Sequence, residues 1–235
     1  PEQSSINSEG LWDDLNTTQK QLLRGEYGLA AAQYLHERAV ELYNQWSEEG
    51  EDFRAAFTQA GQAQSPYLTI QEAVQDLSHA LFYLESTVKD YKLARPAGLL
   101  GCVESSCPQH IESPYALISK ENIIANLEMG RKIFLGGESA ADGLGFDDYL
   151  LMMEPAGTSL ESMELSLNNA ISQAKALEGT VYSHVSTLDP QACAAGEAPL
   201  CALYESLKEF TDQLKTRFVE LLALEIPQQA AGDAD

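Results

Sequence analysis

The chain has 235 residues and a formal net charge of −22, with 44% hydrophobic residues. It therefore has enough apolar residues for a buried core, but it lacks the basic footprint of a protein that binds DNA or RNA. No apolar run approaches the roughly 20 residues that a membrane span requires, so we expect no transmembrane segment. The large negative charge has two alternative interpretations: it keeps the protein soluble, or it serves to bind a cationic ligand, because an acidic surface attracts cations.

The first half of the chain predicts two long helices. After a polar lead-in over residues 1–15, Asn16 or Thr17 is placed to cap a helix that runs to about Glu48. Its apolar residues recur every three or four positions, as on one face of a helix. A short amphipathic segment and a linker follow over residues 51–67. Thr69 and Glu72 then have the spacing of a capping box, which predicts a helix that ends before Pro96.

The second half predicts three further long helices or helical segments of an all-α fold. We expect Ser119 to cap a helix that stops at Gly136, and Thr158 with Glu161 to open another that reaches about Gly179. A short helix is expected between them over residues 146–153, with a possible further helical segment at 182–188. The last long helix is expected from Pro199 to about residue 224. Long helices with short connections are typical of an antiparallel four-helix bundle, here over residues 69–224.

The four cysteines occur as two close pairs, Cys102 with Cys107 and Cys193 with Cys201. Neither pair has the C-x-x-C spacing of a zinc site, so we expect two local disulfides and an oxidising compartment. The chain begins at Pro1 without a signal peptide. We expect a processed product, or a piece of a longer protein, whose targeting segment has been removed.

Candidate site residues gather in the stretch between the second and third long helices. Lys92 and Arg95 stand at the end of one helix, where cations suit the helix dipole, or where one of them could pair with Glu112. Glu112 and Ser113 follow in the loop. Either they bind a ligand, or they are structural: Glu112 accepts hydrogen bonds from backbone N–H groups, and Ser113 caps a turn. We expect Ser119 to cap a helix. The alternative is a binding role, because the N-terminus of a helix has free N–H groups that can bind an anion. His110 is a weaker candidate, and Asp142, Asp147 and Asp148 lack the spacing of a calcium loop.

Several segments resemble the imelysin family. They are YKLARPAG, HIESPYALISKENIIANLEMGRKIFLGG and GLGFDDYL, together with the earlier LAAAQYLHERAVELYNQW. The resemblance covers most of the chain and implies a helical protein of two four-helix-bundle halves. It also implies export to the bacterial periplasm or outer membrane. On this basis we expect residues 1–60 to hold a lead-in and the last helix of a first, largely absent bundle. Residues 61–227 would form the second four-helix bundle, and residues 228–235 a disordered tail.

The resemblance also implies a metal-type motif, Gly-x-His-x-x-Glu, in the first half of the family's fold. A histidine and a glutamate at that spacing lie on one helix face and can share a metal. None of the four histidines here stands in that motif. We therefore assign no metal ligand. We expect the missing first-half helices, on the same or on a separate polypeptide, as a partner.

Three functional hypotheses follow. The first, which the resemblance to imelysins implies, is an exported protein of iron or metal acquisition that holds a cation or an iron-bearing ligand between two helical halves. The ligands of this hypothesis are iron or another divalent metal, and its site residues are Lys92, Arg95, Glu112, Ser113 and Ser119. The second is a metallopeptidase of the imelysin type, for which this chain offers too few ligands to work alone. The third is a non-catalytic module that recognises another protein of the cell envelope. We favour a binding protein over an enzyme.

Overall fold

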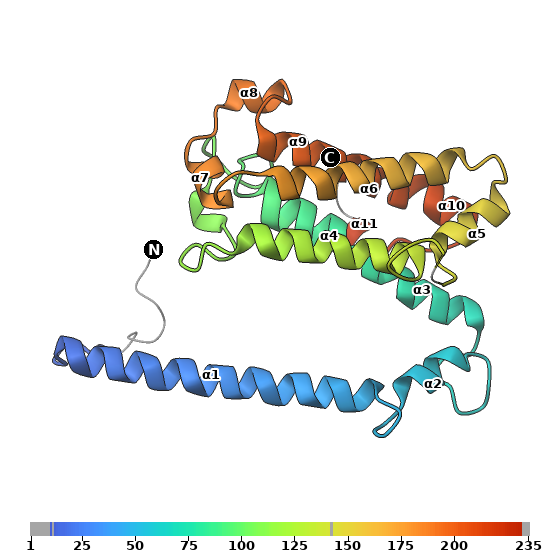
Figure 1. Ribbon diagram of the computed structural model, residues 1–235, viewed down its shortest axis with the longest axis horizontal. Coiled ribbons are helices and arrows are strands. Elements are labelled where there is room, and N and C mark those ends of the chain that lie inside the picture. The colour runs from blue at the N-terminus through green and yellow to red at the C-terminus, as the bar shows by residue number, and fades with distance from the viewer. Residues whose placement is uncertain (1–9, 11, 142, 232–235) are drawn as a thin grey trace. The chain divides into compact units, whose positions relative to one another are not determined.

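The structure is a computed structural model that describes residues 10, 12–141 and 143–231. It is 66% helical and has no strand in the part it describes, which confirms the predicted all-α fold (Figure 1). Over the same residues, no helix is both long enough and apolar enough to span a bilayer. The chain divides into two compact units, Pro1–Ala73 and Val74–Asp235, and each is described by itself.

The first unit consists mainly of two helices, α1 (Thr17–Trp46) and α2 (Phe53–Thr58). Asn16 caps α1 as predicted: its side chain accepts from the Gln19 N–H at 3.0 Å, and the Gln19 side chain accepts from the Asn16 N–H. The side chain of Asp52 caps α2 in the same way, by accepting from Ala55 N–H. Trp46, the last residue of α1, packs edge to face against Phe53, the first residue of α2, with 5.1 Å between the ring centroids. No residue of α1 is buried.

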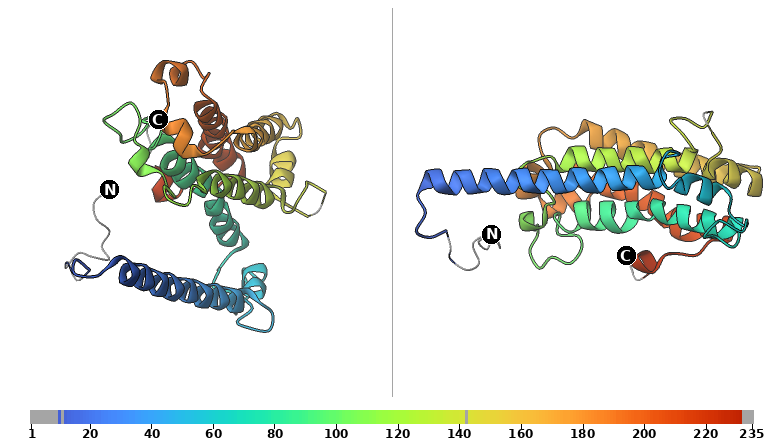
Figure 2. Two further views of the ribbon diagram at one scale, coloured as in Figure 1. Left: turned by 60° about the vertical axis from the view of Figure 1, so that its left-hand side comes forward. Right: turned by 90° about the horizontal axis from the view of Figure 1, so that it is seen from below.

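The second unit is built on four long helical segments, each beside two others. In chain order they are α3 (Ile70–Leu81) continued by the π-helix η2 (Leu84–Ala94), α4 (Ser119–Leu135), α6 (Thr158–Ala176), and α9 (Pro199–Gln213) continued by η4 (Leu214–Phe218) and α10 (Val219–Leu222). Neighbouring contacts run from η2 to α4, to α6, to α9 and back to η2. Figure 1 and Figure 2 show successive segments running in opposite directions, so the predicted antiparallel four-helix bundle is confirmed.

Short helices connect and flank the bundle. They are α5 (Phe146–Met153), α7 (Val181–Ser186), α8 (Pro190–Ala194) and α11 (Gln228–Ala231), with a 3₁₀ turn η3 at Pro108–His110. The helix α11 falls in the segment expected to be a tail, and its Ala230 is buried. Residues 232–235 of that segment lie outside the described part.

The core of the bundle is an apolar cluster in which each long helical segment contributes side chains at helical spacing. Phe134 of α4 packs edge to face on Phe210 of α9, with 5.8 Å between ring centroids. Fully buried members come from every segment: Leu84, Val88, Ile123, Leu127, Phe134, Met163, Leu167, Leu203, Leu207 and Phe210. Burial of these stripes, at about 25 cal/mol per Å² of apolar surface, stabilises the fold far more than helix propensity does.

Two predicted helix caps are wrong. Ser119 is the first residue of α4 and Ile118 precedes it as the N-cap, so the Ser119 hydroxyl does not cap the helix. Thr158 likewise is the first residue of α6, because Gly157 adopts a left-handed conformation with φ 69° and takes the cap position. The Glu154 carboxylate accepts from the next N–H, that of Ser159, at 2.8 Å. A carboxylate from the preceding turn thus replaces the expected local cap.

The predicted capping box of the second long helix is half confirmed. The Thr69 hydroxyl accepts from the Glu72 N–H at 3.1 Å, while the Glu72 carboxylate accepts from the Leu68 N–H at 2.6 Å in place of that of Thr69. The helix was expected to run without interruption to Pro96. Its second part is instead the π-helix η2, and the last long helix passes through the π-helix η4.

Candidate functional site

Lys92 joins three segments at the end of η2. Its ammonium donates to Asn126 Oδ1 of α4 at 2.7 Å. It also lies 3.0 Å from Glu112 Oε1, in the loop between η2 and α4. The Lys92 side chain is 7% exposed and that of Glu112 is 36% exposed. A charge withdrawn from water to this extent needs hydrogen-bonded partners of opposite charge. The Glu112 carboxylate is therefore fixed by a buried cation and keeps one side toward solvent.

The loop around Glu112 is held by its neighbours. Ile111 inserts into the core and is 5% exposed. On the other side, the Ser113 N–H donates to the buried Ser119 Oγ at 3.3 Å. Four predicted site residues, Lys92, Glu112, Ser113 and Ser119, thus come together, and the hydroxyl of Ser119 orients the loop.

Arg95 and His110 occupy different places from these four. The Arg95 guanidinium stacks over the ring of Tyr91 at 4.2 Å, as in a cation–π contact. The ion pair with Glu112 is made by Lys92. His110 ends the 3₁₀ turn and is exposed. Among the described residues, no group of three or more His, Cys, Asp or Glu side chains could hold a metal ion. The residues present therefore do not fit a metal centre built by this part of the chain alone.

Asn126 was not predicted as a site residue. Its segment, Ile123–Leu127, belongs to one of the stretches that carry the family resemblance. The polar Asn126 there stands next to the buried Leu127 on α4. A polar amide within such an apolar segment is a usable signal, because a half-buried amide needs a partner across the bundle.

Both predicted disulfides are present, Cys102–Cys107 and Cys193–Cys201. The first one closes a turn within the site loop, and the N–H of Cys107, a residue that is 2% exposed, donates to Pro96 O at 2.8 Å. The second one links α8 to the first turn of α9. The loop that carries Glu112 is consequently held by the Cys107–Pro96 hydrogen bond on one side and by Ser119 on the other.

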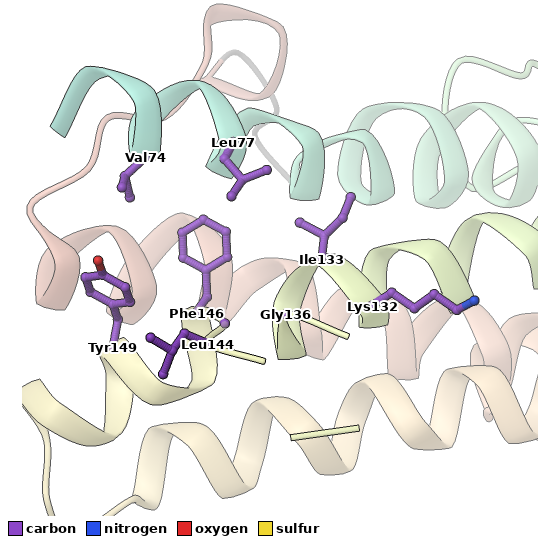
Figure 3. A pocket seen from close by; sticks show the side chains of 9 residues that line it. Val74, Leu77, Lys132, Ile133, Gly136, Leu144, Phe146 and Tyr149 are labelled. Carbon is purple, nitrogen blue, oxygen red and sulfur yellow. The ribbon is translucent and has the colours of Figure 1, made fainter. Parts of the chain in front are cut away.

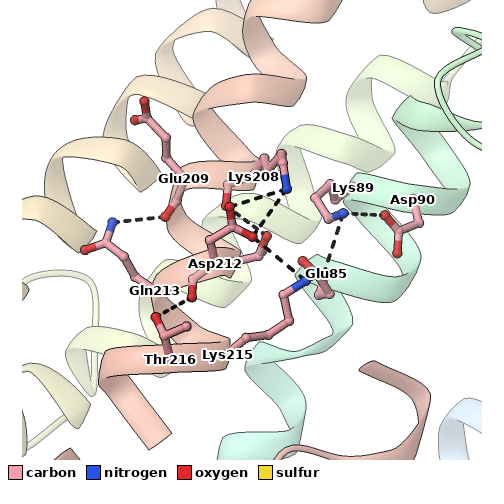
Figure 4. A network of polar contacts seen from close by, with 10 residues as sticks. Glu85, Lys89, Asp90, Lys208, Glu209, Asp212, Gln213, Lys215 and Thr216 are labelled. Atoms are coloured by element: carbon pink, nitrogen blue, oxygen red, sulfur yellow. Dashed lines mark hydrogen bonds and ion pairs between the residues drawn. The ribbon is translucent and has the colours of Figure 1, made fainter. Parts of the chain in front are cut away.

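A second polar cluster lies inside the bundle, between η2 and the end of α9 (Figure 4). The Lys89 side chain is fully buried, with its ammonium 2.7 Å from Asp90 Oδ1 and 3.6 Å from Glu85 Oε1. Lys89 also lies 5.6 Å from the ring centroid of Tyr204. Glu85, equally buried, lies 2.5 Å from the Lys215 ammonium of η4. The buried charges thus pair across the two π-helical segments.

This buried network was not predicted from the sequence. Glu85 and Lys89 have the i, i+4 spacing of a surface ion pair, which is the ordinary interpretation of such a pair on a helix. Asp212 extends the network toward solvent, since it pairs with Lys208 at 3.4 Å and with Lys215 at 3.8 Å. The coincidence of π-helix and buried charge is notable because π-turns occur frequently at functional positions.

An apolar hollow of about 290 Å³ lies between α3, α4 and α5 (Figure 3). Figure 3 shows side chains of α3, such as Leu77, facing Phe146 and Tyr149 of α5. Gly136 at the end of α4 has φ 71°, and a Cβ there would collide with the backbone of Leu144, so the turn requires glycine. The hollow has an apolar lining with Lys132 at its edge: Val74, Leu77, Lys132, Ile133, Gly136, Leu144, Gly145, Phe146 and Tyr149.

Carboxyl groups with perturbed pKa values lie on α4, in and just after α5, and on α6; on α4, the hydrogen bond from Lys175 lowers the pKa of Glu128. Burial raises the pKa of Asp147, which stands in the first turn of α5 as predicted. Burial and then the charge of Asp147 raise the pKa of Glu164. Hydrogen bonds from Ser159, followed by that from Arg217, lower the pKa of Glu154 to about 2. Asp142 lies outside the described residues.

The family model for imelysin, whose name classes it among the peptidases, matches residues 9–214. The match covers well over half of the 235 residues and includes every residue of the Lys92–Glu112–Asn126 cluster. The chain belongs to the imelysin family. No curated protein and no solved structure matches the chain.

Proposed function

We propose that this imelysin-family chain is part of an exported protein of iron or other metal acquisition. In this proposal the chain supplies one side of a binding site for an iron-bearing ligand, or for a cation whose further ligands come from other helices. The observation that carries the proposal is the Glu112 carboxylate, which is held by the Lys92 ammonium, itself bonded to Asn126 Oδ1.

The charges around Glu112 favour a metal-bearing ligand over a bare ion. A cation bound directly to Glu112 would meet the Lys92 ammonium 3.0 Å from the same carboxylate, and like charges so close weaken binding. A chelate that already surrounds its metal can instead donate hydrogen bonds from its hydroxyl groups to the half-exposed Glu112 carboxylate, whose ion pair with Lys92 stays intact. Imelysin-family membership and the two disulfides agree with an exported protein.

The partner in this proposal is the set of first-half helices, on the same or a separate polypeptide. The apolar residues of α1 support it, because a helix with leucine, tyrosine and tryptophan along its length is usually buried against other helices. Among these, Leu29 is 62% exposed, Leu35 68% and Tyr43 68%. The histidine and glutamate of the family motif would come from those helices.

Titration calorimetry of the purified protein with ferric citrate, and separately with Zn²⁺ and Fe²⁺, tests the proposal. We expect ferric citrate to bind, and Glu112→Gln to weaken the binding about tenfold or more, as expected for loss of a charged hydrogen-bond acceptor. Glu121→Gln is the matched control, because Glu121 is an exposed carboxyl in the first turn of α4, beside the same loop. It should bind as the wild type does. Absence of binding by all three probes to the full-length protein would refute the proposal.

A metallopeptidase is the second candidate, favoured by the name of the matching family model. Such an enzyme needs a metal, a bound water and a general base. Cleavage of a fluorogenic casein substrate, with and without a chelator, separates it from the binding protein. Chelator-sensitive cleavage that Glu112→Gln abolishes would establish the peptidase in place of our proposal.

A further inference from the structure

The C-terminal strap, Leu224–Ala231, packs against the bundle beside α3 and η2. It begins where Ala223 turns the chain with φ 52°, and it ends in the short helix α11. Leu224 is 8% exposed and Ala230 is 2% exposed, so the strap contributes to the core. Between the strap and the bundle lies a crevice of about 420 Å³, lined by His79, Tyr83 and Thr87 on the bundle and by Pro227 and Ala230 on the strap.

The strap is held at its start by the side chain of Gln75. Gln75 Nε2 donates to Glu225 O at 2.7 Å, and the Glu225 N–H donates to Gln75 Oε1 at 2.6 Å. These two bonds fix which way the amide points, because its oxygen must face the N–H and its nitrogen must face the carbonyl. Gln75 Nε2 is therefore a donor.

His79 contacts the same nitrogen. Its Nε2 lies 2.8 Å from Gln75 Nε2. Since the amide nitrogen can only donate, His79 Nε2 must accept, which requires a neutral imidazole with its proton on Nδ1. Nδ1 is 3.9 Å from Asp76 Oδ1, on the same helix. Two further ionisable residues belong to this region: Tyr83 lines the crevice, and Glu225 is the strap residue whose backbone is bonded to Gln75.

Protonation of His79 conflicts with this arrangement. Both ring nitrogens then donate, so Nε2–H would face the NH₂ group of Gln75. If the Gln75 amide turned over to offer its oxygen to His79, its nitrogen would face the Glu225 N–H and its oxygen the Glu225 carbonyl, and both strap bonds would be lost. If the ring moved toward Asp76 instead, Gln75 would lose the contact that holds its side chain. Each outcome weakens the attachment of the strap.

We infer that His79 is a pH-sensitive latch on the C-terminal strap. With neutral His79, the chain His79–Gln75–Glu225 keeps the strap closed on α3 and η2. With protonated His79, the strap opens more often and exposes the crevice along Tyr83 and Thr87. The inference rests on hydrogen-bond geometry within the second unit and does not depend on the ligand of the Glu112 site.

Hydrogen exchange of the strap amides at about pH 8 and about pH 5 tests the latch, after correction for the intrinsic exchange rates. The Glu225, Ala230 and Ala231 N–H groups report on it, because the first is bonded to Gln75 and the other two to Pro227 O. We expect their protection to fall about three- to tenfold at the lower pH, the effect of one lost hydrogen bond. Protection of core amides such as Leu207 should fall less.

Three variants identify the residue responsible. His79→Gln keeps an acceptor without a titrating group, so strap protection should not differ between the two pH values. His79→Arg places a permanent donor there, so protection should be low at both. His184→Gln is the control, because His184 lies on α7 and its ring is bonded to the Glu178 carbonyl before that helix; this variant should keep the wild-type response. Equal wild-type protection at both pH values, a response that survives in His79→Gln, or an equal loss in the core would each overturn the latch.

Discussion

Lys89→Met removes the ammonium at the centre of the buried network but keeps a flexible apolar side chain that occupies most of the same volume. The ammonium lies 2.7 Å from Asp90 and 3.6 Å from Glu85, and the side chains of Lys89 and Glu85 are 0% exposed. Removal of one partner from a buried ion pair costs about 3–5 kcal/mol, because the remaining charge stays buried without compensation. Glu85 keeps the Lys215 ammonium at 2.5 Å, so we expect the lower end, about 3 kcal/mol.

The assay is equilibrium unfolding in urea, followed by far-ultraviolet circular dichroism, for the wild type, Lys89→Met and Lys175→Met. Lys175 gives a matched control: its ammonium lies 2.7 Å from Glu128, but these side chains are 54% and 39% exposed. The same substitution there should cost less than about 1 kcal/mol, since water screens an exposed pair. If Lys89→Met lowers the free energy of unfolding no more than Lys175→Met, the reasoning from burial is refuted.

Two further predictions concern packing and pH. Gly130→Ala should destabilise the bundle by about 1 kcal/mol net, because a Cβ there would lie 2.6 Å from Leu84 Cδ1 and the resulting strain exceeds the gain in helix propensity. Gly28→Ala is the control: a Cβ there meets open space, so this variant should not lower the melting temperature. Equal melting temperatures for the two variants would contradict this. Because Ser159 and Arg217 lower the pKa of Glu154 from 4.5 to about 2, the charged carboxylate contributes stability that is complete above about pH 4.5 and is lost as the pH falls toward 2. The difference in unfolding free energy between wild type and Glu154→Gln should therefore close over that range in denaturant titrations, and a constant difference would be evidence against it.

The long helices could be predicted because their signals are local. Asn16 caps α1 with Gln19 three residues later, and Gly136 ends α4 in the left-handed conformation that glycine favours. The predicted caps at Ser119 and Thr158 failed where a neighbouring residue competed: Ser119 bonds the Ser113 N–H, and Gly157 takes the cap position before α6. Local spacing alone does not show which of several polar groups will reach a free N–H.

The site around Glu112 could likewise be predicted only where its residues are close in sequence. Lys92 and Glu112 could be proposed as a pair because both stand in one short stretch of sequence, and the structure places them 3.0 Å apart. Asn126 was missed because its partner comes from another helix. The Glu85–Lys215 contact was missed for the same reason: it joins residues from the first and the last segments of the bundle, and no spacing rule relates them.

The two bonds between Gln75 and Glu225 have a topological consequence. Gln75 stands almost at the beginning of the second unit and Glu225 close to its end, so the two ends of this unit lie within hydrogen-bonding distance of each other. A chain whose ends meet in this way is suited to circular permutation. A short linker could join the two ends, and new termini could be opened in a connection such as the one between α4 and α5. A mechanical force applied to the two ends of this unit would load the Gln75–Glu225 hydrogen bonds before the packing of the apolar core.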